Sequence, residues 1–380
     1  MGRIETNFKQ TEVGLIPVDW EDSTFKEICW VNQGLQIPIS NRFALPNKDS
    51  KLYITIQYLN DGKEAEYIDD YNDSVCCNKE DILMTRTGNT GIVVSDVEGV
   101  FHNNFFKINF DRKKIDKDFL TYYLKQPKTK KIILAQAGVS TIPDLNHRDF
   151  YSIPIPLPPT KTEQTLIANA LSDADDYIES LEKLIDKKQK IKQGSLQQLL
   201  KPKPHWEVKK LGDFLDYEQP TKYLVKEVNY DEGNQTPVLT AGKTFVLGYT
   251  EEDWGIFENL PVIIFDDFTT AIKYVDFSFK AKSSAMKMLL PKNESVNLRF
   301  IYEVMRQIKS EATEHKRHWI GEYRNIEITI PTSPEEQATI AQILSDIDSE
   351  ITALTQKLTK AKAIKQGMMQ QLLTGKIRLI

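Results

Sequence analysis

Residues 163–173 read EQTLIANALSD, and residues 336–346 read EQATIAQILSD. The same shift of 173 residues that places Glu163 on Glu336 also places IKQGSLQQLL (191–200) on IKQGMMQQLL (364–373). Chance does not produce agreement over so long a segment. The chain therefore contains an internal repeat, and its architecture follows from that repeat.

Both repeated segments have the signals of long helices. Thr160 and Ser333 lie close to prolines and are followed three residues later by Glu, which predicts helix starts of the capping-box type. Beyond these starts, apolar residues recur at alternating spacings of three and four, as in a coiled-coil seam. The predicted helix-pairing residues are Ile167, Leu171, Ile178, Leu181, Ile185, Ile340, Leu344, Ile347, Ile351, Leu354 and Leu358.

Each apolar stripe needs an apolar partner, and the simplest partner is the other copy. Because a whole domain separates the two segments in the chain, the two helices can run antiparallel. About 35 residues at about 1.5 Å per residue would make a spacer of roughly 50 Å between two domains. The alternative is two ordinary amphipathic helices, each packed on its own domain.

The repeat also predicts the domain boundaries. A tryptophan marker opens each half, Trp20 in PVDWE and Trp206 in PHWEV. We predict a first domain at residues 1–158, a helical spacer at 159–201, a second domain at 202–331, and a second helical spacer with a C-terminal tail at 332–380.

The two intervening domains have mixed secondary structure. Short β-branched or alternating runs predict strands, and two stretches predict helices. The predicted strands lie at 52–56, 81–85, 91–94, 105–108, 261–265 and 286–289, and the predicted helices near 118–126 and 297–309. Because these elements occur in the same order, we predict an α+β protein of two mixed α/β domains that share a fold, separated by two long antiparallel helices in a pseudo-twofold repeat.

The composition of the 380 residues, 40% hydrophobic and 27% charged, is that of a soluble globular protein without a membrane span. A net charge of −5 and a pI near 5.7 argue mildly against DNA binding. However, basic residues are concentrated twice, with nine against three acidic residues at 107–131 and eleven against six at 273–324. The few cysteines, Cys29, Cys76 and Cys77, and an N-terminus without an apolar core predict a cytoplasmic protein with no metal site and no cofactor.

Several motifs together resemble one family. They are GLIPVDW at 14–20, LPP at 157–159, the duplicated EQxxIA…LSD helices, and QQLLTGKIR at 370–378. Nearly the whole chain resembles the DNA-specificity subunits of type I restriction-modification enzymes.

This resemblance implies a non-catalytic subunit with two target recognition domains, each reading one half of a bipartite, gapped site in double-stranded DNA. It implies that the helices dock methyltransferase subunits, two of them, and that motor-nuclease subunits join through the complex. It does not reveal which bases are read.

Candidate DNA-binding residues follow from chemistry alone. The loop TRTGNTG at 85–91 offers a bidentate donor, an amide, hydroxyls and glycines that allow close backbone approach. Other candidates lie in polar or basic stretches that predict loops. In the first domain the candidates are Arg86, Thr87, Asn89, Thr90, Ser140 and Thr141. In the second they are Lys222, Tyr223, Lys243, Thr269, Thr270, Lys282, Ser283, Ser284, Arg317, His318 and Arg324.

Other functions fit the sequence less well. The Pro-Pro pair at 158–159 is flanked by Leu157 and Thr160, not by the Asn or Asp and the aromatic residue that an amino-methyltransferase motif requires. Neither a Gly-rich phosphate loop nor a nuclease pattern is evident. Asp266 and Asp267 could bind a divalent ion, but a loop that orients neighbouring basic residues is favoured. A coiled-coil scaffold for proteins and the recognition subunit of a related, non-type-I restriction system remain alternatives.

Overall fold

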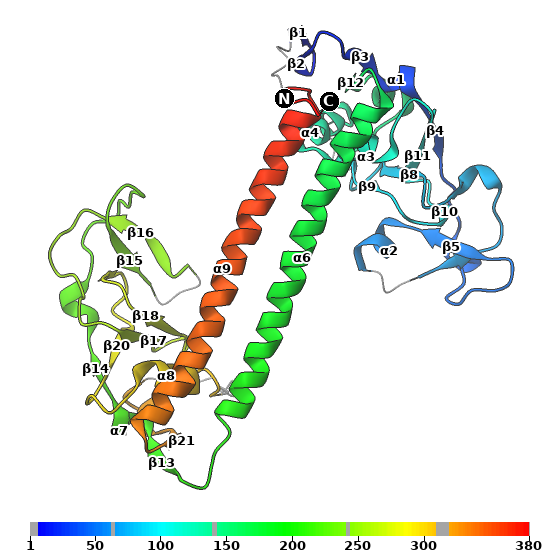
Figure 1. Cartoon of the computed structure of the whole chain (residues 1–380). Helices are drawn as coiled ribbons and strands as arrows, with labels where there is room; N and C mark the ends of the chain where they lie inside the picture. The colour runs from blue at the N-terminus through cyan, green and yellow to red at the C-terminus, as the bar shows by residue number, and fades with distance from the viewer. Residues whose placement is uncertain (1–6, 62–64, 139–142, 241–243, 309–318, 380) are drawn as a thin grey trace. The chain divides into compact units, whose positions relative to one another are not determined.

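The computed structural model describes residues 7–61, 65–138, 143–240, 244–308 and 319–379. The chain forms two compact units, one made of Met1–Glu182 with Gln356–Ile380 and the other of Lys183–Thr355. The long helices α6 (Lys161–Leu199) and α9 (Pro334–Leu372), green and orange to red in Figure 1, each contribute one part to each unit. The predicted architecture of two mixed domains with long helices is confirmed.

The domain of the first unit is a succession of short strands and helices (Figure 1). Its strands are β1 (Phe8–Thr11), β2 (Gly14–Pro17), β3 (Glu21–Thr24), β4 (Cys29–Gln33), β5 (Lys51–Ile54), β6 (Tyr67–Ile68), β7 (Cys76–Cys77), β8 (Ile82–Thr85), β9 (Val93–Val94), β10 (Gly99–Phe101), β11 (Phe105–Phe110) and β12 (Pro154–Leu157). Its helices are α1 (Phe25–Ile28), α2 (Ile56–Asp61), α3 (Lys117–Lys125), α4 (Pro127–Gln136) and α5 (His147–Tyr151). An antiparallel sheet in the order β4-β11-β8-β9 and a second sheet in the order β6-β5-β10-β7, with β5 and β10 parallel, form its framework.

The domain of the second unit has a similar succession. Its strands are β13 (Trp206–Lys210), β14 (Leu215–Glu218), β15 (Thr236–Leu239), β16 (Val246–Thr250), β17 (Val262–Asp266), β18 (Ile272–Val275), β19 (Lys280–Ala281), β20 (Met286–Pro291) and β21 (Glu327–Pro331). Its helices are α7 (Leu211–Phe214) and α8 (Leu298–Met305), with 3-10 turns η3 (Pro220–Tyr223) and η4 (Tyr323–Asn325). The sheets run β14-β20-β17-β18 and β16-β15-β19, and β15 is parallel to β19.

The two domains share one topology, as the order of strands and helices predicts. The sheet β4-β11-β8-β9 corresponds strand by strand to β14-β20-β17-β18, and the parallel pair β5-β10 corresponds to β15-β19. In both domains, the strand at the opening tryptophan marker pairs with the strand that leads into a long helix: β3 with β12, and β13 with β21. In the first domain Trp20 lies just before β3, whereas in the second Trp206 begins β13.

Apolar side chains of the long helices are part of each domain's core. Ile167 and Leu171 of α6, and Leu372 of α9, lie in one buried cluster with the first domain's residues. In the second unit, Ile340 and Leu344 of α9 lie in the corresponding cluster. Because side chains of the long helices are part of each buried core, each domain depends on these helices for its stability.

Candidate nucleic-acid interface

The loop between β8 and β9 carries four predicted DNA-binding residues. Gly88 and Gly91 have φ angles of +82° and +83°, a conformation that glycine adopts without strain. The Thr85 hydroxyl accepts a hydrogen bond from the backbone N–H of Ile92 at 2.8 Å and so closes the loop. The side chain of Asn89 lies exposed at the tip.

The side chain of Arg86 is held inside the domain. Its guanidinium lies 2.9 Å from the Asp144 carboxylate, donates to the Leu145 carbonyl at 3.3 Å, and stacks 5.4 Å from the Phe106 ring. Only 15% of the Arg86 side chain is exposed. The hydroxyl of Thr87 also donates to Asp144. The arginine therefore braces the loop against residues 143–145, and the sequence gives no signal for a partner 58 positions away.

Thr90 belongs to the same brace. Its side chain is buried, and its hydroxyl donates to the carbonyl of Pro143 at 2.7 Å. Of the predicted residues in this loop, the structure therefore brings three together on segment 143–145 and leaves Asn89 facing solvent.

The corresponding loop of the second domain joins β17 to β18. The Asp266 carboxylate accepts from the Thr269 hydroxyl at 2.6 Å and from the Phe268 N–H at 3.2 Å. Thr270 has a φ of +56°, an unusual conformation for a β-branched residue. Thr269 and Thr270 thus shape a tight turn.

Asp267 fixes this turn to the rest of the second domain. Its carboxylate forms a 2.8 Å ion pair with Lys287, and both side chains are at most 10% exposed. It also accepts from the backbone N–H of Trp319 at 2.9 Å. Residues 143–145 come before β12, the last strand of the first domain, and Trp319 comes before β21, the last strand of the second. The two loops are therefore braced from equivalent segments of their domains.

The other predicted residues of the second domain are scattered. Lys222 lies 3.6 Å from the carboxylate of Glu218, and the Tyr223 hydroxyl donates to that carboxylate at 2.9 Å. Arg324 is exposed in η4. Lys282 and Ser284 are exposed, and Ser283 accepts from the N–H of Ala285. The predicted residues Ser140, Thr141, Lys243, Arg317 and His318 lie outside the described residues.

The predicted helix-pairing residues differ in burial along the helices. Those near the helix starts, with Leu181, are buried: Ile167, Leu171, Leu181, Ile340 and Leu344. The others are half-buried: Ile178, Ile185, Ile347, Ile351, Leu354 and Leu358.

Ion pairs join the two helices in each unit. In the first unit Lys365 pairs with Asp175 and Lys362 with Glu182, and in the second Lys192 pairs with Asp348 at 2.5 Å. Lys188 pairs with Glu350 in the same way. Rising numbers on α6 meet falling numbers on α9 in each unit, so the helices are antiparallel. Lys192–Asp348 and Lys365–Asp175 are the same pair under the shift of the repeat.

The repeated Glu-Gln motif forms the junction between each domain and its long helix. The Gln164 amide oxygen accepts from the N–H of Asp116 at 2.9 Å, and that of Gln337 accepts from the N–H of Asn297 at 3.1 Å. Asp116 and Asn297 are the N-caps of α3 and α8. Both glutamines are at most 4% exposed. This pair of bonds explains why both copies carry the same amide.

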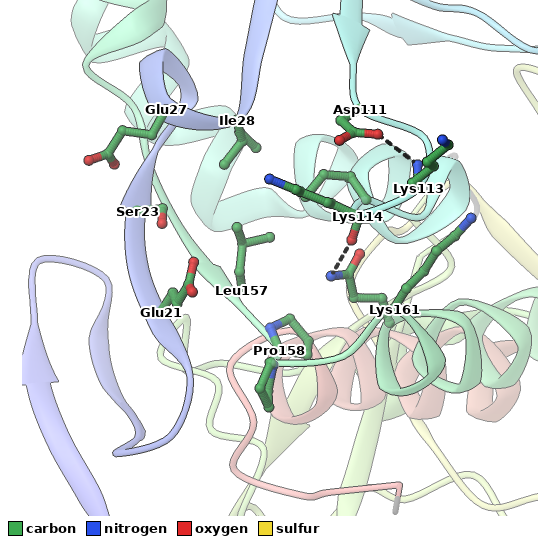
Figure 2. Close-up of a pocket in the computed structure, with 13 residues that line it drawn as sticks. Glu21, Ser23, Glu27, Ile28, Asp111, Lys113, Lys114, Leu157, Pro158 and Lys161 are labelled. Carbon is green, nitrogen blue, oxygen red and sulfur yellow. Dashed lines mark hydrogen bonds between the residues drawn. The ribbon is translucent and has the colours of Figure 1, made fainter.

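A cavity of about 590 Å³ opens beside the first junction (Figure 2). Gln164 donates to the Lys114 carbonyl at 3.2 Å at its edge. Acidic and basic side chains both line the cavity: Glu21, Glu27, Asp111, Lys113, Lys114 and Lys161. A smaller cavity of about 200 Å³ lies at the second junction, beside Gln337. The balanced charge fits a solvated seam between domain and helix.

The glutamates of the motif bind basic residues that follow the long helices. Glu163, 1% exposed, pairs with Arg378 of the C-terminal tail, which also pairs with Asp19 at 3.0 Å. Glu336 accepts from Lys203 at 2.7 Å and from His205 at 2.9 Å. These hydrogen bonds lower the pKa of Glu336 to about 2.

A family of known proteins matches each half of the chain separately. Residues 17–193 and 204–364 each match the family described as the type I restriction modification DNA specificity domain. The chain belongs to this family. The two matches coincide with the two copies of the internal repeat.

Individual relatives agree with this family. The EcoR124I/EcoR124II type I specificity subunit of Escherichia coli is 50% identical over 156 residues, which covers 39% of this chain and 39% of the relative. The MjaVIII type I specificity subunit of Methanocaldococcus jannaschii is 25% identical over 99% of this chain and 97% of its own length. A crystal structure of the type I S subunit from M. genitalium has the same fold, with a TM-score of 0.68 and 19% identity over 97% of this chain and 99% of that one.

The described residues also bear on two other classes of site. Among those residues, no helix has the length and apolar character that crossing a membrane requires. In the same part of the chain, no group of three or more His, Cys, Asp or Glu side chains is placed to hold a metal ion.

Proposed function

We propose that this chain is the DNA-specificity subunit of a type I restriction-modification enzyme and that it has no catalytic activity of its own. In this role the domains at residues 1–158 and 202–331 are target recognition domains, each reading one half of a bipartite site in double-stranded DNA. The observation that carries the proposal is a duplicated scaffold on which equivalent, braced loops differ in sequence. One scaffold with two different loops suits one task performed on two different sequences.

The partners of the proposed complex are two methyltransferase subunits, with motor-nuclease subunits joining through the complex. We place this complex in the cytoplasm, where the DNA lies. An outer face repeated on the long helices supports two copies of one partner. It consists of Lys187, Ile191, Gly194 and Gln198 on α6 and of Lys360, Ile364, Gly367 and Gln371 on α9. The spacing of four, three and four residues places each set on one side of its helix.

The repeated face is open in both copies. Ile191 and Ile364 are 43% and 53% exposed, and a Cβ added at Gly194 or Gly367 would meet nothing within 4 Å. The repeat keeps these four residues in both copies, three of them within the segment 191–200, which matches 364–373 at all but two positions. A surface present twice would bind the same partner twice.

The proposed function is tested with the chain co-expressed with its methyltransferase. The complex is expected to select a bipartite sequence from a random DNA pool, whereas the purified chain alone should neither methylate nor cleave DNA. Selection of no sequence by the complex, or methyl transfer by the isolated chain, would contradict the proposal.

The docking face is tested by native mass spectrometry. Ile191→Asp and Ile364→Asp should each remove one methyltransferase subunit, and the double variant should remove both. Ile343→Asp is the matched control, because Ile343 is 40% exposed on α9 and does not belong to the repeated face. Equal loss of partners in the control would assign the effect to the helix as a whole.

A further inference from the structure

The turn between β17 and β18 presents a phenyl ring to solvent. Phe268 is 70% exposed, and its backbone N–H is bound by Asp266 at 3.2 Å. The backbone N–H of Thr270 donates to the Asp266 carbonyl at 2.9 Å, and the backbone N–H of Asp266 donates to the Ala271 carbonyl at 3.0 Å. The ring therefore stands on a turn whose backbone is fixed.

The base of the turn is fixed as well. Asp267 is buried between Lys287 and the N–H of Trp319. Trp319 is 1% exposed and packs against Phe265 of β17, with ring centroids 5.6 Å apart. Ile320, the residue after Trp319, is 46% exposed. The domain thus uses buried polar bonds to hold an exposed apolar tip.

The equivalent position in the first domain has a different chemistry. There the β8–β9 loop, braced by Asp144, exposes the amide of Asn89. The two loops follow equivalent strands and are held from equivalent segments, so their tips are comparable positions. The first tip offers an amide donor and acceptor, whereas the most exposed large side chain of the second tip is the apolar ring of Phe268.

We infer that Phe268 is a specificity-determining residue of the second domain and that it contacts the 5-methyl group of a thymine. This inference rests on the proposed function. A phenyl ring has no hydrogen-bonding group, and the thymine methyl is the apolar group that base edges present in the major groove. Because β17 is buried within the sheet β14-β20-β17-β18, the turn that follows this strand would enter the groove. Lys273, exposed on the strand β18 that follows this turn, would supply positive charge for a phosphate.

The test uses the complex of the full chain with its methyltransferase and DNA in which single thymines are replaced by deoxyuridine, which lacks the methyl group. At one position of the second half-site, this replacement should weaken binding of the unchanged protein roughly fourfold, which is the change in affinity expected when the burial of one methyl-sized group is lost. Phe268→Ala should bind both DNAs equally and leave the first half-site unchanged. Phe268→Leu should retain part of the preference.

Phe277→Ala is the control, because Phe277 is another exposed phenylalanine of the same domain, 41% exposed. The inference is overturned if the second half-site contains no thymine that matters, or if Phe268→Ala keeps the preference for thymine. It is also overturned if Phe268→Ala weakens all sequences equally while reducing DNA bending, which would make the ring a wedge between base pairs. If Phe268→Ala loses a protein partner and keeps its DNA preference, the tip is a protein contact. Absence of any sequence selection by the unchanged complex would instead contradict the proposed function.

Discussion

Replacing Arg86 and Asp144, singly and together, separates two roles for the β8–β9 loop. If the arginine braces the loop, Arg86→Ala removes two charge-assisted bonds and the stacking on Phe106. The Asp144 side chain is half exposed, so solvent weakens the ion pair, and we expect a total loss of about 2 kcal/mol. For the first unit, this loss of stability corresponds to a decrease in melting temperature of roughly 4–8 °C.

The double-mutant cycle measures the pair itself. Asp144→Ala should also destabilise the first unit, and the two changes together should cost about 1 kcal/mol less than their sum. In random-pool selection, both single variants should relax the same positions of the first half-site and leave the second half-site intact.

Two results would refute the brace. One is additive destabilisation with no coupling energy. The other is that Asp144→Ala keeps full sequence selectivity while Arg86→Ala loses about 1 to 3 kcal/mol of binding free energy at a single guanine. That pattern would mean that the arginine reads the base directly. A uniform loss of affinity across all sequences would make Arg86 a phosphate contact.

Three further predictions concern the junctions. Gln164→Leu should lower the free energy of unfolding by about 1–3 kcal/mol, because it leaves the partly buried N–H of Asp116 without its acceptor; an unchanged urea midpoint would contradict this. Because folding lowers the pKa of Glu336, its ionised carboxylate stabilises the folded state above about pH 4.5, and this stabilisation is lost as pH falls towards about 2. Glu336→Gln should therefore flatten this part of the curve of stability against pH. An unchanged curve would refute the assignment. Gly375→Ala should lower the melting temperature, because φ is +67° and the new Cβ would lie 2.5 Å from Pro17, whereas Gly194→Ala, with open space, should not.

The sequence predicted the features that depend on local patterns. The duplicated helices follow from periodicity and capping residues, and Thr160 and Ser333 accept hydrogen bonds from the N–H groups of Glu163 and Glu336, as a cap does. Strand order was also predictable, although boundaries moved: the strand expected at 52–56 ends at Ile54 as β5, and Ile56 begins α2.

The long-range contacts could not be predicted in this way. Nothing in the sequence near Arg86 indicates Asp144, and nothing near Asp267 indicates Lys287 or Trp319, because no local pattern encodes which distant segments pair. The surface position of Phe268 is also not evident in the sequence, where an aromatic residue near a strand suggests a core position. Its exposure follows only from the geometry of the turn.

The repeated junction also bears on how such a protein can change. Gln164 and Gln337 bind backbone N–H groups, and Glu163 and Glu336 bind residues that follow the helices, so these junction bonds do not involve a loop tip. An entire domain can thus be exchanged as a cassette without altering how it is mounted. A gene built this way can acquire a new sequence preference in one recombination event while its assembly surfaces stay the same.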